Sequence, residues 1–339
     1  MTTFVDTSVL LSGPEAADND PIVVVVRSAM PMFREAGESA ALAFELDFRA
    51  KYESDDFSGV FDLLLGQAEI IFAKVANVAD PEMLLRVAKT AEGYFEVVLS
   101  ILSKLDSIEG VSDRVDKFIN TVACCENSGL KLRLLVTLMN LFSPKTFLRH
   151  KVVNALCVCG VSAAPFVLQC DSWAVHWEIP SAEKAAMFVR VASICEGDDK
   201  IKFLKLAARL QTDLAELLLL EAIKLPEFVR FVELSDFKSN NSQITKCIEI
   251  FESGTIADME TFCANGGVSG VEGLVDKMRV IALAAGGPRR VTLTDPTLVI
   301  RALQLGVIKG AIDSVKGFVE ITAVLPRTRK ELETIVNAL

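Results

Sequence analysis

The sequence has 339 residues, of which 51% are apolar and 24% charged, and its net charge is −10. This length allows one long helical array with a small terminal module, or two domains, and the apolar share is sufficient for a continuous core. The negative charge excludes a protein that coats nucleic acid along its whole surface. Aromatic residues contribute only 7% and are mostly Phe, which disfavours an extended β-rich architecture.

Residues 1–30 have a mixed pattern and are predicted to form a flexible N-terminal arm. The first basic residue, Arg27, follows several acidic ones, so a secretory signal is not expected. An uncharged run at 152–170 contains Gly160 and Pro165, which favours a turn between two buried helices over a membrane span. The eight cysteines lie mostly in apolar runs, as expected of buried thiols in a reducing cytosol. We therefore expect a cytoplasmic protein with no membrane partner.

Residues 31–285 are predicted to be a helical-repeat region. Apolar residues recur there at steps of three and four, as in the stretch 57–75. Pro81 after Asp80 is typical of the first turn of a helix. Ser143, Ser181 and Thr212 are expected to cap further helices. Polar breaks separate these stretches, which predicts a TPR/HEAT-like stack of antiparallel helix pairs, right-handed by expectation only.

The pattern changes after residue 285. Residues 291–293 alternate like a short strand, and Asp295-Pro296 is expected to cap a helix that runs to about Leu305. Two β-prone runs, 307–313 and 317–324, then form a hairpin signal. The sequence predicts a small winged-helix module at 286–326 and an amphipathic C-terminal helix at 327–339.

Residues for catalysis, metal or cofactor binding are sparse. The two histidines, His150 and His176, lie in no metal-binding pattern, and a packed or half-exposed histidine is the favoured interpretation of His176. Cys157-x-Cys159 lacks a second ligand pair at matching spacing. The glycine-rich stretch 265–273 is not followed by Gly-Lys-Ser/Thr. We expect no enzyme activity, no cofactor, no metal and no small-molecule substrate.

Several segments together are similar to a known family. The helix-and-loop segment 251–259, the helix 276–284, the stretch 298–313 and the returning strand 318–324 resemble the C-terminal module of PCI-domain proteins. Among them, the chain is most similar to the subunit m family of eukaryotic translation initiation factor 3. The residues that carry this closer resemblance are Leu134–Leu141, Phe142, Arg149 and the run 152–160, and more faintly Phe4-Val5-Asp6.

The resemblance implies a non-catalytic scaffold subunit. Such a protein would dock against other PCI-type subunits of a large complex and support initiation at the small ribosomal subunit, in direct or indirect contact. The alternatives are a PCI subunit of the COP9 signalosome or the proteasome lid, and a free-standing helical-repeat adaptor. The candidate interface residues are Ile308, Ile312, Phe318, Ile321, Ile335, Val336 and Leu339, and the sequence leaves open whether those of the hairpin belong to the core instead.

Basic residues are concentrated at the C-terminal end. From Asp276 onward there are ten Lys/Arg and six Asp/Glu, a local charge of +4, which leaves −14 for the remainder. The candidate RNA-contacting residues are Arg289, Arg290, Arg327, Arg329 and Lys330. A solvated basic surface is the favoured interpretation of this small excess.

Overall fold

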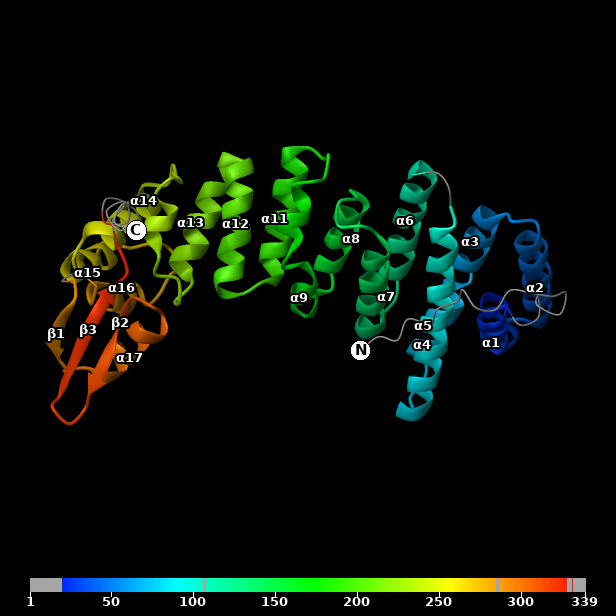
Figure 1. The fold of residues 1–339 in the computed structure, drawn as a ribbon, viewed down its shortest axis with the longest axis horizontal. Coiled ribbons are helices and arrows are strands. Elements are labelled where there is room, and N and C mark those ends of the chain that lie inside the picture. Colours follow the sequence, from blue (N-terminus) through cyan, green and yellow to red (C-terminus); the bar gives the residue numbers. More distant parts are fainter. Residues whose placement is uncertain (1–19, 106–107, 285–286, 328–330, 332–339) are drawn as a thin grey trace. The chain divides into compact units, whose positions relative to one another are not determined.

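The structure is a computed structural model that describes residues 20–105, 108–284, 287–327 and 331. It is mostly helical, with one small antiparallel sheet near the C-terminus (Figure 1). The contacts divide the chain into two compact units, Met1–Glu178 and Ile179–Leu339. The predicted mostly α-helical class with a small strand-bearing module is confirmed. The right-handed stacking and the domain boundaries at 30, 285 and 326 stay predictions.

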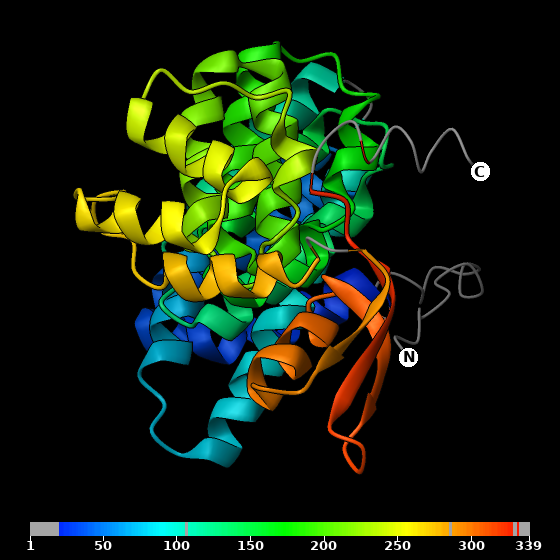
Figure 2. The ribbon, with the colours of Figure 1, turned by 90° about the vertical axis from the view of Figure 1, so that its left-hand side faces the viewer.

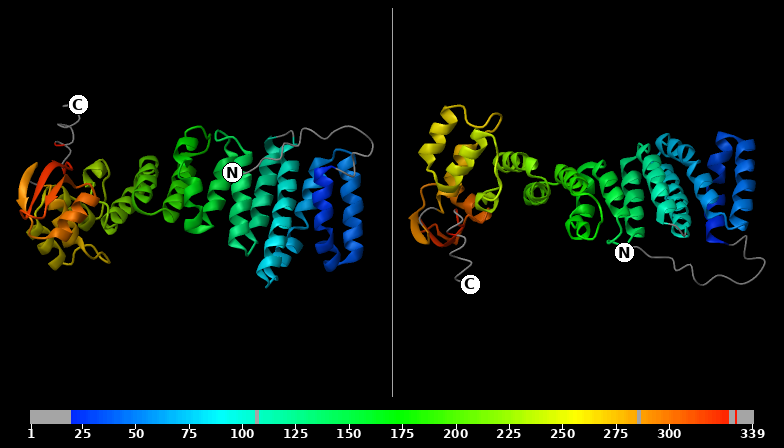
Figure 3. Two further views of the ribbon diagram at one scale, coloured as in Figure 1. Left: turned by 60° about the horizontal axis from the view of Figure 1, so that its bottom comes forward. Right: turned by 90° about the horizontal axis from the view of Figure 1, so that it is seen from above.

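Unit 1 is built from helices alone in its described part. Its helices are α1 Pro21–Ala36, α2 Glu38–Glu53, α3 Phe57–Leu65, α4 Ala68–Ala76, α5 Pro81–Ser103, α6 Ile108–Ala123, α7 Ser128–Leu141, α8 Leu148–Cys157, a 3-10 turn η3 Gly160–Ala163, α9 Ala164–Val167 and α10 Cys170–Ala174. The long helix α5 packs against α1, α3, α4 and α7, and α6 packs against α7 and α8. Figure 3 shows these helices lying side by side in two further views.

An aromatic cluster forms much of the unit 1 core. Tyr94 and Phe95 of α5 are fully buried, and Phe72 stacks on Phe95 with ring centroids 5.1 Å apart. The Tyr94 hydroxyl donates a 2.7 Å hydrogen bond to the Leu64 carbonyl, so its polar end is satisfied within the core. Side chains from α1 to α6 therefore share one core.

Unit 2 begins with helices and ends with the sheet. Its helical elements are α11 Ser181–Ile194, α12 Gly197–Leu210, η4 Thr212–Leu214, α13 Ala215–Lys224, η5 Phe231–Leu234, α14 Ser242–Ser253, α15 Ile256–Ala264 and α16 Leu274–Ala282. The C-terminal part contains β1 Arg289–Thr292, α17 Pro296–Gln304, β2 Ile308–Asp313 and β3 Phe318–Val324. In Figure 2 the three strands lie beside α17.

The sheet has the order β1-β3-β2, and both strand pairs are antiparallel. The predicted hairpin and the helix after Asp295 are confirmed, since the Asp295 side chain accepts a 3.1 Å hydrogen bond from the Leu298 backbone N–H. A bulge at Lys309/Gly310 shifts the β2–β3 register. β1 and β2 are therefore both edge strands of a three-stranded sheet.

Three of the predicted caps are wrong. Ser181 is the first residue of α11, behind Pro180, and makes no capping bond. Thr212 begins a 3-10 turn, and Ser143 begins a turn that precedes α8. Side chains that do cap helices are Asp20, Asp56, Asp80, Asn127, Asn241, Thr255 and Asp295.

The uncharged run at 152–170 is interrupted in the structure. α8 ends at Cys157, and the chain continues through η3 into the short helix α9. Among the helices that the structure describes, none combines the length and the apolar character needed to cross a bilayer.

Candidate docking surfaces

The predicted interface residues of the hairpin fall into two groups. Ile308 and Ile321 are buried, at 1% and 3% exposure, and belong to the core of the C-terminal module. Ile312 and Phe318 are half-buried at the surface of the sheet. Ile335, Val336 and Leu339 lie outside the described residues. Of the described candidates, Ile312 and Phe318 keep part of their surface exposed, and Arg290 covers one face of the Phe318 ring.

The outer edge of β2 is the most regular candidate surface. Lys309, Gly310 and Ala311 are exposed along this strand, and β3 pairs with one side of it only. An edge strand of this kind presents backbone N–H and C=O groups that another strand can bind. Gly310 has a special role, because a Cβ atom at this position would overlap the carbonyl oxygen of Glu320. Glycine thus permits the close approach of β2 and β3 at the bulge.

Three of the five predicted RNA-contacting residues lie in the described part of the chain, and their surroundings differ. Arg290 pairs with Glu320 at 3.7 Å and lies over the Phe318 ring at 4.2 Å, while Arg289 is exposed on the same strand. Arg327 is half-buried and donates to the carbonyls of Phe251 and Gly254, at 3.0 and 3.1 Å. Arg329 and Lys330 lie outside the described residues. Arg327 therefore has a structural partner, the end of α14, which the sequence did not indicate.

Lys277 holds another helix end inside unit 2. It lies on α16 with 4% of its surface exposed. Its ammonium donates to the carbonyls of Ala222, Ile223 and Leu225 at the end of α13, over 2.7–3.2 Å. The ring of Phe231 lies 4.8 Å from the nitrogen. Burial lowers the pKa of Lys277 to about 7, whereas three carbonyl acceptors match the three hydrogens of the charged form. The residue joins α13 to α16.

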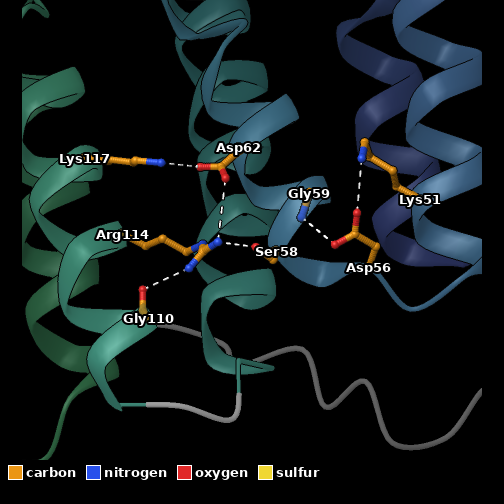
Figure 4. A network of polar contacts seen from close by, with 8 residues as sticks. All are labelled: Lys51, Asp56, Ser58, Gly59, Asp62, Gly110, Arg114 and Lys117. Atoms are coloured by element: carbon orange, nitrogen blue, oxygen red, sulfur yellow. Dashed lines mark hydrogen bonds and ion pairs between the residues drawn. The ribbon is translucent and has the colours of Figure 1, made fainter.

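A polar network joins α3 to α6 in unit 1 (Figure 4). Arg114 donates to the Gly110 carbonyl and to Ser58, and it lies 3.7 Å from Asp62. Lys117 donates to the same carboxylate at 3.0 Å. On the neighbouring turn, Asp56 accepts from the Gly59 backbone N–H and from Lys51 (Figure 4). Each of these charged side chains lies next to one of opposite charge. The contacts therefore stabilise the packing of neighbouring helices.

Two open hollows of the surface are each lined by side chains of opposite charge. A hollow of about 620 Å³ beside this network is lined by α3 and α6 residues, including Asp62 and Lys117. A second, of about 540 Å³, lies between α16 and α17, where Asp276 pairs with Arg279 at 2.9 Å. Neither hollow contains a histidine. Asp62 pairs with Lys117, and Asp295 caps α17, so part of the charge that lines these hollows is engaged in an ion pair or a cap.

Of the two histidines weighed for metal or base chemistry, His176 is exposed, and His150 has packing partners. The His150 ring lies 6.0 Å from that of Trp177, and its Nε2 is 3.0 Å from the Asn154 amide nitrogen. Trp177 is buried and donates to the Pro144 carbonyl. Over the described residues, no group of three or more His, Cys, Asp or Glu side chains is placed to hold a metal ion.

Comparison with known proteins identifies a distant relative. No family profile matches the chain. The chain is similar to eukaryotic translation initiation factor 3 subunit M of Dictyostelium discoideum, with 26% identity over 161 residues. The matched region covers 43% of this chain and 40% of that protein, so it spans less than half of the relative. This similarity supports a distant relation to that subunit.

Proposed function

We propose that the chain is a non-catalytic scaffold subunit of a cytoplasmic translation initiation factor 3 complex. The observation that carries the proposal is the distant match to subunit M of that factor. The order of elements gives independent support, because a helical region is followed by β1, α17 and the β2–β3 hairpin, as the resemblance to PCI proteins implies.

The proposed mode of action is docking through the C-terminal module. The β2 edge would add to a strand of a neighbouring PCI-type subunit, and Ile312 and Phe318 would contact the same neighbour. The subunit would support initiation at the small ribosomal subunit by holding its neighbours in place, without a reaction of its own. Its contact with the ribosome would be direct or through those neighbours.

Affinity purification of the tagged full chain, followed by mass spectrometry, tests the assignment. We expect initiation factor 3 subunits and small ribosomal proteins among the stoichiometric partners. Cullin-linked signalosome subunits, proteasome-lid subunits or the absence of stoichiometric partners would each contradict it.

The docking mode has a separate test on the β2 edge. Ala311→Lys places a charge on the edge strand, which disfavours pairing with another strand. Val315→Lys adds the same charge at the hairpin tip, where the side chain is 95% exposed. We expect recovery of the neighbouring subunits to fall with Ala311→Lys and to stay unchanged with Val315→Lys. Equal recovery with both variants would rule out the edge as the docking site.

A further inference from the structure

The helix α2 is apolar on two opposite faces. One face buries Ala41, Phe44 and Phe48 against α1 and α3. The opposite face, which we call the outer face of α2, carries Leu42 and Leu46, with 50% and 69% of their surface exposed. By helical spacing it consists of Ser39, Leu42, Ala43, Leu46, Ala50 and Glu53.

This outer face has the form of a helix-packing surface. Leu42 and Leu46 are one helical turn apart and form a ridge. The small residues Ala43 and Ala50 lie beside them and leave shallow grooves along this ridge. Solvent-facing sides of surface helices are normally polar. The two neighbouring leucines and the alanines beside them give this face an apolar character that suits it to contact with another apolar surface.

The charges around the outer face are unbalanced. Glu38, Asp47 and Glu53 are exposed and form no ion pair within the described part of the chain. The nearby cations are already paired: Arg34 and Arg49 with Glu45, at 3.9 and 3.0 Å, and Lys51 with Asp56, at 3.1 Å. Of the charged residues named here, five are carboxylates (Glu38, Glu45, Asp47, Glu53, Asp56) and three are cations (Arg34, Arg49, Lys51), so the border of the apolar stripe has a net charge of −2, which suits a basic partner.

We propose that the outer face of α2 docks an amphipathic helix of another protein, whose apolar stripe is flanked by Lys and Arg. A second copy of this chain fits less well, because a twofold contact would bring the same unpaired carboxylates together. This surface lies on unit 1 and is independent of the β2 edge on unit 2. It would give the chain a second attachment point.

A pair of synthetic helices tests the proposal against the full-length chain. Both are 18-residue peptides with leucine at positions i, i+3, i+4 and i+7; one has Lys flanks and the other Glu flanks. Binding is measured by fluorescence anisotropy at moderate salt. We expect the Lys peptide to bind at least tenfold more tightly than the Glu peptide, and Asp47→Lys/Glu53→Lys to reverse this preference.

Variants of the exposed leucines locate the binding site. Leu42→Ser/Leu46→Ser should weaken binding of the Lys peptide at least tenfold, whereas Met83→Ser/Leu85→Ser, which changes exposed apolar residues of α5, should not alter it. Circular dichroism checks that each variant is folded. The proposal is wrong if the Lys peptide does not bind or binds all these chains equally.

Two further measurements separate this proposal from others. A dimer in sedimentation velocity that is lost in Leu42→Ser/Leu46→Ser would identify a second copy as the occupant and overturn the proposal. Ala311→Lys should leave peptide binding unchanged. Failure of the β2-edge docking and failure of the α2 surface are thus observed independently.

Discussion

Three buried or half-buried cations perform the same task in different parts of the chain. Arg149 donates to the Phe142 carbonyl at the end of α7, and Lys277 and Arg327 bind the ends of α13 and α14. The last carbonyls of a helix lack hydrogen-bond donors within it and carry partial negative charge. A cationic side chain supplies donors and also compensates this charge. Each also ties a helix to a segment further along the chain.

Removal of the Lys277 ammonium should destabilise unit 2. Lys277→Met keeps most of the side-chain volume but leaves three buried carbonyls without their donor, at a cost of about 2–4 kcal/mol. Urea unfolding followed by circular dichroism measures this cost. Lys246→Met, on the exposed side of α14, is the matched control and should change stability by less than about 0.5 kcal/mol. Equal effects of the two substitutions would contradict the capping role.

Lys277 should also make stability depend on pH. Its pKa falls from the ordinary value of 10.5 to about 7 on folding. Between these values the unfolded chain binds more protons, so the contribution of Lys277 to stability rises with pH, by at most ~1.4 kcal/mol per unit. The difference in unfolding free energy between wild type and Lys277→Met, measured at pH 7, 8 and 9, isolates this effect. A difference independent of pH would mean that the carbonyls hold the ammonium form throughout.

The exposed arginines of β1 should be dispensable for RNA binding. Arg290 is paired with Glu320 and covers Phe318, and Arg327 is bound to the end of α14. We expect Arg289→Glu/Arg290→Glu to leave the salt dependence of RNA affinity unchanged, as measured by filter binding. A fall in the salt slope of one or more would instead assign phosphate contacts to these residues.

The sequence was least informative about single residues with distant partners. Lys277 and Arg327 are bound to carbonyls at least 52 residues away in the chain. Backbone carbonyls have no signature in the side-chain pattern, so Arg327 was predicted as a surface charge. The wrong caps at Ser143, Ser181 and Thr212 have a related cause, because Ser and Thr near a helix start also fit the turn before it or its first residue.

At the scale of elements, hydrophobic periodicity was a better guide. The stretch 57–75 became α3 and α4, and the alternation at 307–313 and 317–324 became β2 and β3. These patterns are local and repeat over many residues, so one atypical residue does not change the predicted element. The docking surface on α2 was not foreseen, because exposure of Leu42 and Leu46 depends on which neighbours α2 has.

The β2–β3 hairpin should depend strongly on Gly310. Gly310→Val introduces a side chain that overlaps the Glu320 carbonyl, so the strands must separate at the bulge. We expect a loss of about 2 kcal/mol or more from unit 2, together with lower recovery of neighbouring subunits. Hydrogen exchange of the β3 amides gives the direct readout.

Ala311→Val provides the control for that measurement. It adds a β-branched side chain one residue away, at an exposed position. Protection of the β3 amides should persist in this variant. Protection that also persists in Gly310→Val would show that the hairpin tolerates a side chain at the bulge.

At the scale of the whole molecule, the chain divides into two compact units, each with buried side chains of its own. We expect calorimetry to resolve two unfolding transitions, one for each compact unit. Tyr94→Phe removes the hydrogen bond to the Leu64 carbonyl and should lower only the unit 1 transition by a few degrees. Lys277→Met should lower only the other. A single transition shifted by both substitutions would refute independent units.

The reactivity of Lys277 can report how often unit 2 opens transiently between α13 and α16. With 4% of its surface exposed and its hydrogens bound to carbonyls, the amine can react with an acylating reagent only while α13 and α16 are apart. Mass spectrometry can measure the acylation rate of Lys277 relative to that of exposed lysines. This ratio therefore reports how often the native protein opens at this site.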